Sequence, residues 1–136
     1  MTKLSIKLLV FDQSKQTESM AKETLSPRGF DIITASSMAL AVFLARKNFP
    51  SVIVSGASEN KGDELAFLTE IKSDPDLDQI PFVLVLPKED LQTRQKALQM
   101  GAAKILTQPL SSAKFMAELS PFLVELKDER PEETSE

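Results

Sequence analysis

Short apolar runs alternate with longer segments of helical periodicity along this chain. Short, continuous apolar runs are typical of strands that are covered on both faces, as in a parallel sheet. Four such runs occur at residues 7–11, 52–55, 82–86 and 105–107, and residues 31–34 alternate apolar and polar side chains. The pattern therefore predicts five strands, four of them covered on both faces.

Segments with helical spacing and recognisable start and stop signals separate these strands. Serine and aspartate are preferred at helix starts, and glycine or proline often follows a helix end. The first four helices are predicted to run from Ser14 to Ser26, from Ser36 or Ser37 to Phe49, from Asp63 to Asp74, and from Asp90 to Gly101. In the second helix, Leu40, Phe43 and Leu44 share one face with Lys47.

A fifth helix is predicted from about Ser111. Its apolar face would consist of Phe115, Leu119, Phe122, Leu123 and Leu126. Pro121 falls inside this helix and predicts a kink or a new turn capped by Ser120, because proline removes one backbone hydrogen bond. Residues 127–136 contain no apolar side chain, so we expect a frayed acidic tail or the start of a linker after a domain of residues 1–126.

Five strands alternating with five helices predict a doubly wound α/β fold around a parallel sheet. Each parallel crossover needs a helix, and right-handed crossovers place helices on both faces of the sheet. In such folds, ligands bind at the carboxyl ends of the strands. The residues predicted to lie there are Asp12, Gln13, Gly56, Leu86, Pro87, Gln108 and Pro109.

The composition excludes several classes of function. The chain has 136 residues, enough for one domain with its own core, and contains neither cysteine nor histidine. Disulfides, thiolate metal sites and histidine-based catalysis are therefore excluded. A net charge of −4 argues against nucleic-acid binding, and neither a membrane-spanning apolar run nor a signal peptide is recognisable. We therefore expect a cytoplasmic protein.

Several segments, taken in order and spacing, resemble one known family. They are Lys7 to Asp12, Arg28 to Phe30, Asp63 to Leu68, Ser73 to Pro81 and Gly101 to Pro109. Together they resemble the receiver domain of two-component response regulators over about residues 4–126. The resemblance implies a flavodoxin-like fold with five parallel strands in the order 2-1-3-4-5 and five flanking helices. It also implies a signalling domain and not an enzyme.

Receivers accept a phosphoryl group on an aspartate after the third strand. Two acids after the first strand hold Mg²⁺, and a Ser/Thr and a lysine bind the phosphoryl oxygens. Here Asp12 retains the first acid, and four other residues occupy the remaining positions: Gln13, Gly56, Leu86 and Gln108. The resemblance therefore implies a degenerate phosphorylation pocket without a catalytic residue, a metal or another cofactor. It also implies a cis peptide bond at Pro109, where receivers usually have one.

Single residues of this region have structural interpretations as well. Asp12 could be a residual metal ligand, but a carboxylate that accepts nearby amide hydrogen bonds is favoured, since a lone acid binds hard cations poorly. Leu86 could fill the old pocket or simply end a buried strand. Ser55, Ser58 and Glu59 could act as alternative phosphate acceptors, although no base is available to activate a hydroxyl there.

A docking surface is predicted on the fourth helix, fifth strand and fifth helix, the face that receivers commonly use for partners and dimers. Gln92, Gln95 and Gln99, with Lys96, recur there at helical spacing, opposite Leu91, Ala97 and Leu98. A solvated helix face is the alternative interpretation of these glutamines. We expect two apolar residues to extend the surface, Ile105, at the position of the family's aromatic switch residue, and Met116.

The sequence thus favours a pseudo-receiver, a phosphorylation-independent interaction module in bacterial signalling, polarity or motility. It would bind a protein partner or form a homodimer, and would not bind nucleic acid or a membrane. Two alternatives stay open: a phosphoacceptor switch with a displaced acid, and a small-molecule sensor that uses the vacated crevice at the carboxyl ends of the strands. The sequence does not specify the partner, the output or the oligomeric state.

Overall fold

The computed structural model describes the backbone of residues 6–12, 15–56 and 63–134, and their side chains except those of residues 63–64 and 124–134. Its centre is a parallel five-stranded sheet in the order β2-β1-β3-β4-β5. The strands are β1 (Lys7–Phe11), β2 (Asp31–Ala35), β3 (Val52–Gly56), β4 (Phe82–Leu86) and β5 (Lys104–Thr107). The predicted strands and their order are confirmed.

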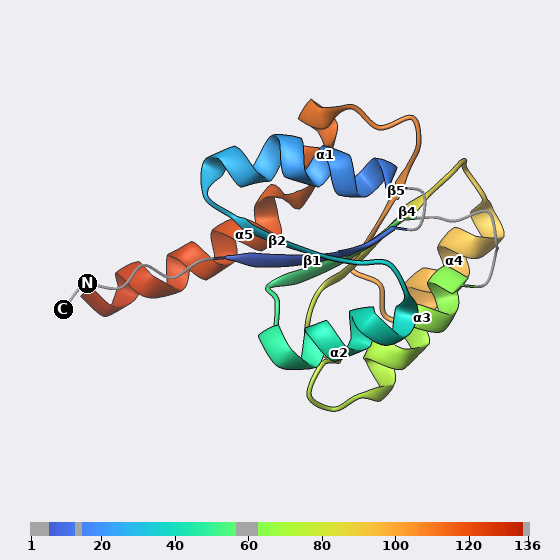
Figure 1. Ribbon diagram of the computed structural model, residues 1–136, viewed down its shortest axis with the longest axis horizontal. Helices are drawn as coiled ribbons and strands as arrows, with labels where there is room; N and C mark the ends of the chain where they lie inside the picture. The colour runs from blue at the N-terminus through green and yellow to red at the C-terminus, as the bar shows by residue number, and fades with distance from the viewer. Residues whose placement is uncertain (1–5, 13–14, 57–62, 135–136) are drawn as a thin grey trace.

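Helices cover both faces of this sheet, as Figure 1 shows. They are α1 (Gln16–Leu25), α2 (Met38–Asn48), α3 (Asp63–Ser73), α4 (Leu91–Gln99) and α5 (Ser112–Thr134), with a short 3-10 helix, η1 (Ser26–Arg28), after α1. α1 and α5 lie on one face, and α2, α3 and α4 lie on the other (Figure 1). The fold is the predicted doubly wound α/β architecture. Within the described residues, no helix is both long enough and apolar enough to span a bilayer.

Alternation of side chains along the strands gives each face of the sheet its own core. In β1, Val10 points towards α1 and α5, whereas Phe11 points towards α2, α3 and α4. The second of these cores contains three aromatic rings in a row. The ring centroids of Phe11 and Phe67 are 5.0 Å apart, and those of Phe67 and Phe82 are 5.5 Å apart. Burial on both faces explains why the strand sequences are apolar almost throughout.

Three predicted helix ends are confirmed by their hydrogen bonds or backbone angles. The hydroxyl of Ser37 accepts a hydrogen bond from the Leu40 N–H at 3.2 Å, which caps α2. The Asp90 carboxylate accepts one from the Thr93 N–H at 3.2 Å, which caps α4. Gly101 follows α4 with a φ of 109°, as expected for a left-handed cap.

The face of α2 that carries Leu40 and Phe43 is not the buried one. Instead α2 buries Ala41 and Ala45, both 0% exposed, whereas Leu40 is 39% and Phe43 is 57% exposed. Small alanine side chains let a helix lie close to a sheet, and larger side chains beside them are then turned towards solvent. The sequence pattern marked the large residues and missed the small ones that make the contact.

α5 is longer than the sequence suggests. It runs through Pro121 without interruption and continues to Thr134, beyond the predicted end near Leu126. Phe115 and Leu119, both 0% exposed, hold its first turns in the core, and a proline removes only one backbone hydrogen bond. The residues after Leu126 are mainly lysine, glutamate and arginine, which are good helix formers. Figure 1 shows these last turns extending away from the sheet.

Candidate functional site

Four of the five positions of the expected phosphorylation pocket lie together at the carboxyl ends of the strands. Asp12 follows β1, Gly56 ends β3, Leu86 ends β4 and Gln108 follows β5. Because these strands are neighbours in the parallel sheet, the four positions follow one another along a single edge, which we call the carboxyl-end edge. The fifth position, Gln13, lies outside the described residues.

Asp12 is turned into the protein and supports the start of α1. It is 2% exposed, and its Oδ2 accepts a short hydrogen bond from the Thr17 N–H in the first turn of the helix. Its backbone carbonyl accepts a second bond from the Lys15 N–H at 3.1 Å. A carboxylate at this place satisfies a helical N–H that has no partner within the helix and is favoured by the helix dipole. The predicted cap, Ser14, lies outside the described residues, and Lys15 at the N-cap makes no side-chain bond of this kind.

Gly56 has no room for a side chain. A β-carbon built on Gly56 would lie 2.5 Å from Cγ and 2.6 Å from Oδ1 of Asp12, whereas carbon atoms in contact are normally about 3.5–4.0 Å apart. Asp12 could make room only by leaving the position in which it binds Thr17. The Asp12 carboxylate therefore occupies the space that a nucleophilic aspartate at position 56 would need.

Leu86 and Ser55 both belong to the interior. Leu86 is 2% exposed and lies in the core between the sheet and α2, α3 and α4, so it ends a buried strand. Ser55 is 0% exposed, and its hydroxyl has no hydrogen-bond partner among the described residues. A phosphate donor in solvent cannot reach a fully buried hydroxyl. The two other candidate acceptors, Ser58 and Glu59, lie outside the described residues.

The backbone after β5 has the cis peptide bond that the resemblance implies. The bond between Gln108 and Pro109 is cis, and the Gln108 N–H donates to the carbonyl oxygen of Leu86 at 2.9 Å. Gln108 is half-buried and presents an amide where receivers have a lysine ammonium group. The backbone here therefore agrees with what the resemblance implies, whereas Gln108 carries no positive charge.

The residues of the carboxyl-end edge do not fit the Mg²⁺ ion that receivers hold at this place. Mg²⁺ needs oxygen ligands in near-octahedral geometry and sheds its water reluctantly. Among the described residues, no three Asp, Glu, His or Cys side chains come together in a way that could hold a metal. Asp12 is turned towards Thr17, and Gly56 offers no side-chain oxygen. The described part of this edge therefore supplies too few ligands for such a site.

The outward face of α4 combines amide and leucine side chains. Its three glutamines are exposed: Gln92, Gln95 and Gln99. Leu91 and Leu98 are exposed as well, at 61% and 47%, although the sequence pattern placed them opposite the glutamines. Of the three residues that the pattern placed opposite the glutamines, only Ala97 is buried, at 0% exposed, and it anchors α4. The leucines and the glutamines therefore belong to one solvent-facing surface, which we call the α4 face.

Ile105 and Met116 contribute less surface than expected. Ile105 is 7% exposed and belongs to the same core as Phe82, which corrects the expectation that its side chain is exposed. The reason is that β5 is covered by helices, so its successive side chains point into one core or the other. Met116 is half-buried against the core formed with α1 and α5. Partner binding at either residue stays a prediction.

An ion-pair network that the sequence did not reveal joins α4 to β5. Arg94 donates to both carboxylate oxygens of Glu89, from Nε at 3.0 Å and from Nη2 at 2.9 Å. The Thr107 hydroxyl accepts from Arg94 Nη2 at 3.1 Å and donates to Glu89 Oε1 at 3.2 Å. The hydrogen bond between Arg94 and Glu89 lowers the pKa of Glu89 and raises the pKa of Arg94. The network holds the segment before α4 against the end of β5.

A second ion pair joins β5 to α5. Lys104 Nζ lies 2.8 Å from Glu118 Oε1 on α5, and this hydrogen bond lowers the pKa of Glu118. β5 is therefore tied by charged side chains to both α4 and α5. The sequence does not indicate either ion pair. Lys104 and Glu118 are 14 residues apart, and both pairs form only because a helix packs beside β5.

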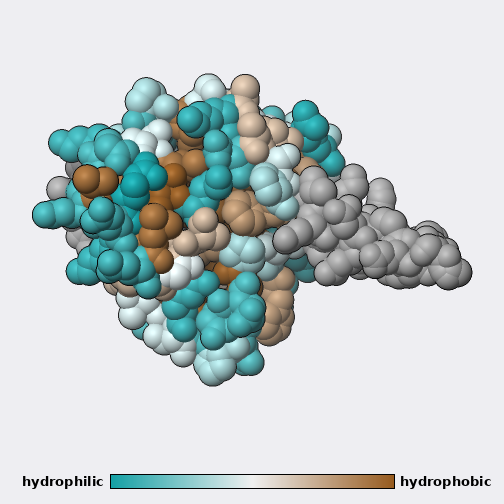
Figure 2. Space-filling model, turned by 180° about the vertical axis from the view of Figure 1, so that it is seen from behind, coloured by the Kyte–Doolittle hydropathy of each residue, from teal (hydrophilic) through white to brown (hydrophobic). Residues whose placement is uncertain are grey.

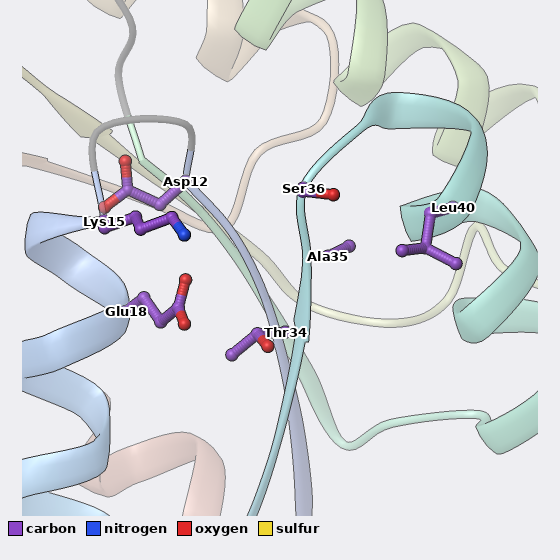
Figure 3. Close-up of a pocket in the computed structure, with 7 residues that line it drawn as sticks. All are labelled: Asp12, Lys15, Glu18, Thr34, Ala35, Ser36 and Leu40. Carbon is purple, nitrogen blue, oxygen red and sulfur yellow. The ribbon is translucent and has the colours of Figure 1, made fainter.

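A small pocket opens next to Asp12 on the β2 side of β1, away from Gly56 (Figure 3). Its volume is about 220 Å³. It is lined by Asp12, Lys15, Glu18, Thr34, Ala35, Ser36 and Leu40. The sequence pointed to the carboxyl ends of the strands as the place for a ligand. This pocket lies at those ends, where β1 and β2 finish, and the sequence did not single out this pair of strands.

No family model matches the chain, but sequence comparison finds relatives. The chain is 26% identical over 113 residues to a "Probable transcriptional regulator ycf27" of Galdieria sulphuraria, covering 83% of this chain and 43% of that protein. It is 24% identical over 123 residues to a "Probable chemotaxis protein CheY" of Rhizobium etli, covering 90% and 95%. The response regulator PleD of Caulobacter vibrioides is 24% identical over 114 residues, covering 84% and 25%. The chain thus spans less than half of the first relative and a quarter of the third.

Solved structures share the fold. The chemotaxis protein CheY4 of Vibrio cholerae superposes with a TM-score of 0.79 at 20% identity, covering 88% of this chain and 99% of that one. A putative response regulator from Chloroflexus aurantiacus gives 0.79 at 17% identity, covering 89% and 99%. The architecture is therefore that of receiver domains. Sequence matches and fold together strongly support a response regulator receiver domain of the CheY type.

Proposed function

We propose that this chain is a pseudo-receiver of bacterial two-component signalling. It is not phosphorylated, catalyses no reaction, and acts in the cytoplasm by docking on a protein partner. The contact between Asp12 and Gly56 carries the proposal. The position of the nucleophile has no side chain, and the neighbouring carboxylate fills the space that one would need.

The other positions of the pocket support the same conclusion. Leu86 lies in the core and has no hydroxyl to bind a phosphoryl oxygen, and Gln108 has no positive charge to attract one. Phosphoryl transfer depends on charge neutralisation by a metal and by cationic side chains. Loss of the hydroxyl or of the lysine alone would slow phosphoryl transfer. Loss of both together with the nucleophilic aspartate leaves no group that could accept the phosphoryl group.

The α4 face is the proposed docking surface. Uncharged amides and exposed leucines are compatible with a protein interface, whose centre is usually depleted of charge. Figure 2, which looks from behind, shows apolar residues in several separate groups between hydrophilic ones. A module that does not switch needs a face that is already held in one conformation. The contacts among Glu89, Arg94 and Thr107, and between Lys104 and Glu118, provide such a constraint.

The decisive experiment is phosphorylation in vitro. The purified domain is incubated with acetyl phosphate and Mg²⁺, and its intact mass is measured beside an active receiver treated in the same way. We expect the active receiver to gain a phosphoryl group and this domain to keep its mass. A stoichiometric acyl-phosphate adduct, or a spectral change induced by beryllofluoride, would support a switch with a displaced acid and overturn the proposal. Recovery of the partner with the intact domain as bait then identifies the pathway.

A further inference from the structure

The pocket between α1 and the end of β2 offers a ligand site that shares Asp12 with the predicted phosphorylation pocket but opens on its β2 side. Its volume of about 220 Å³ lies below the roughly 300–1,000 Å³ of sites for drug-sized ligands. Figure 3 shows that Asp12, Lys15 and Glu18 reach it from the β1 and α1 side, and that the other lining residues belong to β2 and the start of α2. A ligand at this place is therefore a small molecule held between two segments far apart in the sequence.

The α1 side of the pocket carries charges of both signs. Lys15 has a left-handed backbone, with a φ of 68°, and in Figure 3 its ammonium nitrogen points into the pocket. The Glu18 side chain is 18% exposed and pairs with Lys22 at 3.3 Å. Asp12 is already engaged by Thr17 and lies deeper. Lys15 and Glu18 are thus the groups best placed to meet the charges of a ligand.

The β2 side of the pocket combines apolar and hydroxyl side chains. Ala35 is 4% exposed and Leu40 is 39% exposed, so the leucine side chain offers apolar surface to a ligand. The hydroxyls of Thr34 and Ser36 add two groups that can donate or accept a hydrogen bond. The pocket therefore has a wall with charges of both signs and, opposite it, a wall of two hydroxyls and the Leu40 side chain.

We propose that this pocket binds a free α-amino acid with a short aliphatic side chain. The ligand's ammonium group would bind the Glu18 carboxylate, its carboxylate would bind the Lys15 ammonium group, and its side chain would contact Leu40. A phosphate dianion fits poorly, because two carboxylates and one ammonium group line the pocket. This site goes beyond the docking function, since it needs neither a partner nor the α4 face.

The test is a titration of the ¹⁵N-labelled domain with L-leucine, followed by NMR. We expect saturable shifts at Ala35, Ser36 and Leu40 with a Kd of about 1 mM or tighter. Two analogues separate the contributions of the charges: 4-methylpentanoate lacks the ammonium group, and 3-methylbutylamine lacks the carboxylate. Both should bind at least about tenfold more weakly than L-leucine if each charge is recognised. If either analogue binds as tightly as L-leucine, the protein does not recognise both charges of an amino acid and the proposal is wrong. If L-leucine causes no saturable shifts, the pocket is not an amino-acid site.

Matched variants locate the binding to the pocket. Lys15→Met and Glu18→Gln should each weaken L-leucine binding about tenfold. Lys47→Met removes an exposed lysine of α2 that does not line the pocket, so it should bind like the unmodified protein. Thermal melts show whether each variant is folded. If one of the two pocket variants is unfolded, binding by the other variant tests the assignment. Unchanged binding in a folded pocket variant would overturn the assignment. The titration uses the domain alone, so its failure would leave the docking proposal unaffected.

Discussion

The carboxyl-end edge and the α4 face use their polar groups in opposite ways. At the carboxyl-end edge, Asp12 is turned inward onto Thr17 and lies against Gly56. Beside the α4 face, Glu89 and Arg94 form a two-pronged ion pair that also engages Thr107. In the first region the carboxylate serves the start of a helix, and in the second the charged groups hold two elements together.

Under the proposed function, this difference shows how a receiver fold could persist without receiver chemistry. The carboxyl-end edge and the α4 face are linked through β4 and β5, because α4 lies between these two strands in the chain. If the domain binds no phosphoryl group, residues of the carboxyl-end edge are free to serve stability, as Leu86 does in the core. The following changes test this comparison, from the largest expected effect on stability to the smallest.

Gly56→Asp should be the most damaging of these changes. Its β-carbon would collide with Asp12, and a second carboxylate would be placed beside the first, so we expect a loss of about 3 kcal/mol in the free energy of unfolding. Urea denaturation measures it, and acetyl phosphate labelling of the same variant should stay slow or absent. Labelling as fast as that of an active receiver would show that the pocket has not decayed as a whole.

Two control variants separate the steric effect in Gly56→Asp from the electrostatic one. Gly56→Ala brings only the β-carbon and should cost about 1–2 kcal/mol. Combining Gly56→Ala with Asp12→Ala should destabilise less than the sum of the two single changes, because the collision is removed. Simple additivity would mean that Asp12 is not what excludes a side chain at position 56.

Leu86→Thr restores the hydroxyl that receivers have at this position. In this protein it should cost about 2 kcal/mol, because the side chain is 2% exposed and a hydroxyl would replace methyl groups inside the core. Leu86→Val, which stays apolar, should cost about 1 kcal/mol and serves as the control. If Leu86→Thr is as stable as Leu86→Val, the hydroxyl has a hydrogen-bond partner at the carboxyl-end edge, and the surroundings of residue 86 are not purely apolar.

The sequence predicted the parts of the fold that depend on short-range pattern. Strand runs, the caps at Ser37 and Asp90, and the left-handed Gly101 all follow from side-chain periodicity or local hydrogen bonding. The cis bond at Pro109 came only from the family resemblance. The lack of room for a side chain at Gly56 could not be predicted from the sequence, because it depends on the direction of the Asp12 side chain after α1 has packed against the sheet.

Surface exposure was the least predictable property. Ile105 looked like an interface residue but is buried, whereas Leu91 and Leu98 looked like buried residues of α4 but are exposed. In a short helix that buries only a small residue such as Ala97, the large apolar side chains do not mark the inner face. The residue types on a helix face therefore do not predict which of them are exposed until the packing of the helix on the sheet is known.

Glu89→Gln should destabilise the protein in a pH-dependent way. The pKa of Glu89 is lower in the folded protein than its ordinary value of 4.5, because Arg94 donates to the carboxylate. The ion pair therefore contributes stability above that value, and the contribution is lost as the pH falls through the folded-state pKa. The melting temperature of Glu89→Gln should lie below that of the unmodified protein at pH 7, and the two should converge as the pH falls through the folded-state pKa of Glu89.

A second substitution checks that Arg94 is the partner responsible. Arg94→Met should lower the melting temperature at neutral pH, and adding Glu89→Gln to it should have little further effect, because the pair is already broken. A full additional loss in the double variant would mean that Glu89 acts through Thr107 or another group and that the network does not depend on the ion pair.

Gln95→Glu and Gln99→Glu on the α4 face should have the smallest effect on stability and a clear effect on docking. Both side chains are exposed, so each change should alter the free energy of unfolding by less than about 0.5 kcal/mol. A new charge beside Leu98 would have to lose its water on binding, which should weaken partner affinity in calorimetry. Phe43→Gln on α2 is the surface control, and Asp12→Asn is the pocket control. If Asp12→Asn abolishes partner binding while the glutamate variants bind normally, the carboxyl-end edge and not the α4 face is the functional region of this protein.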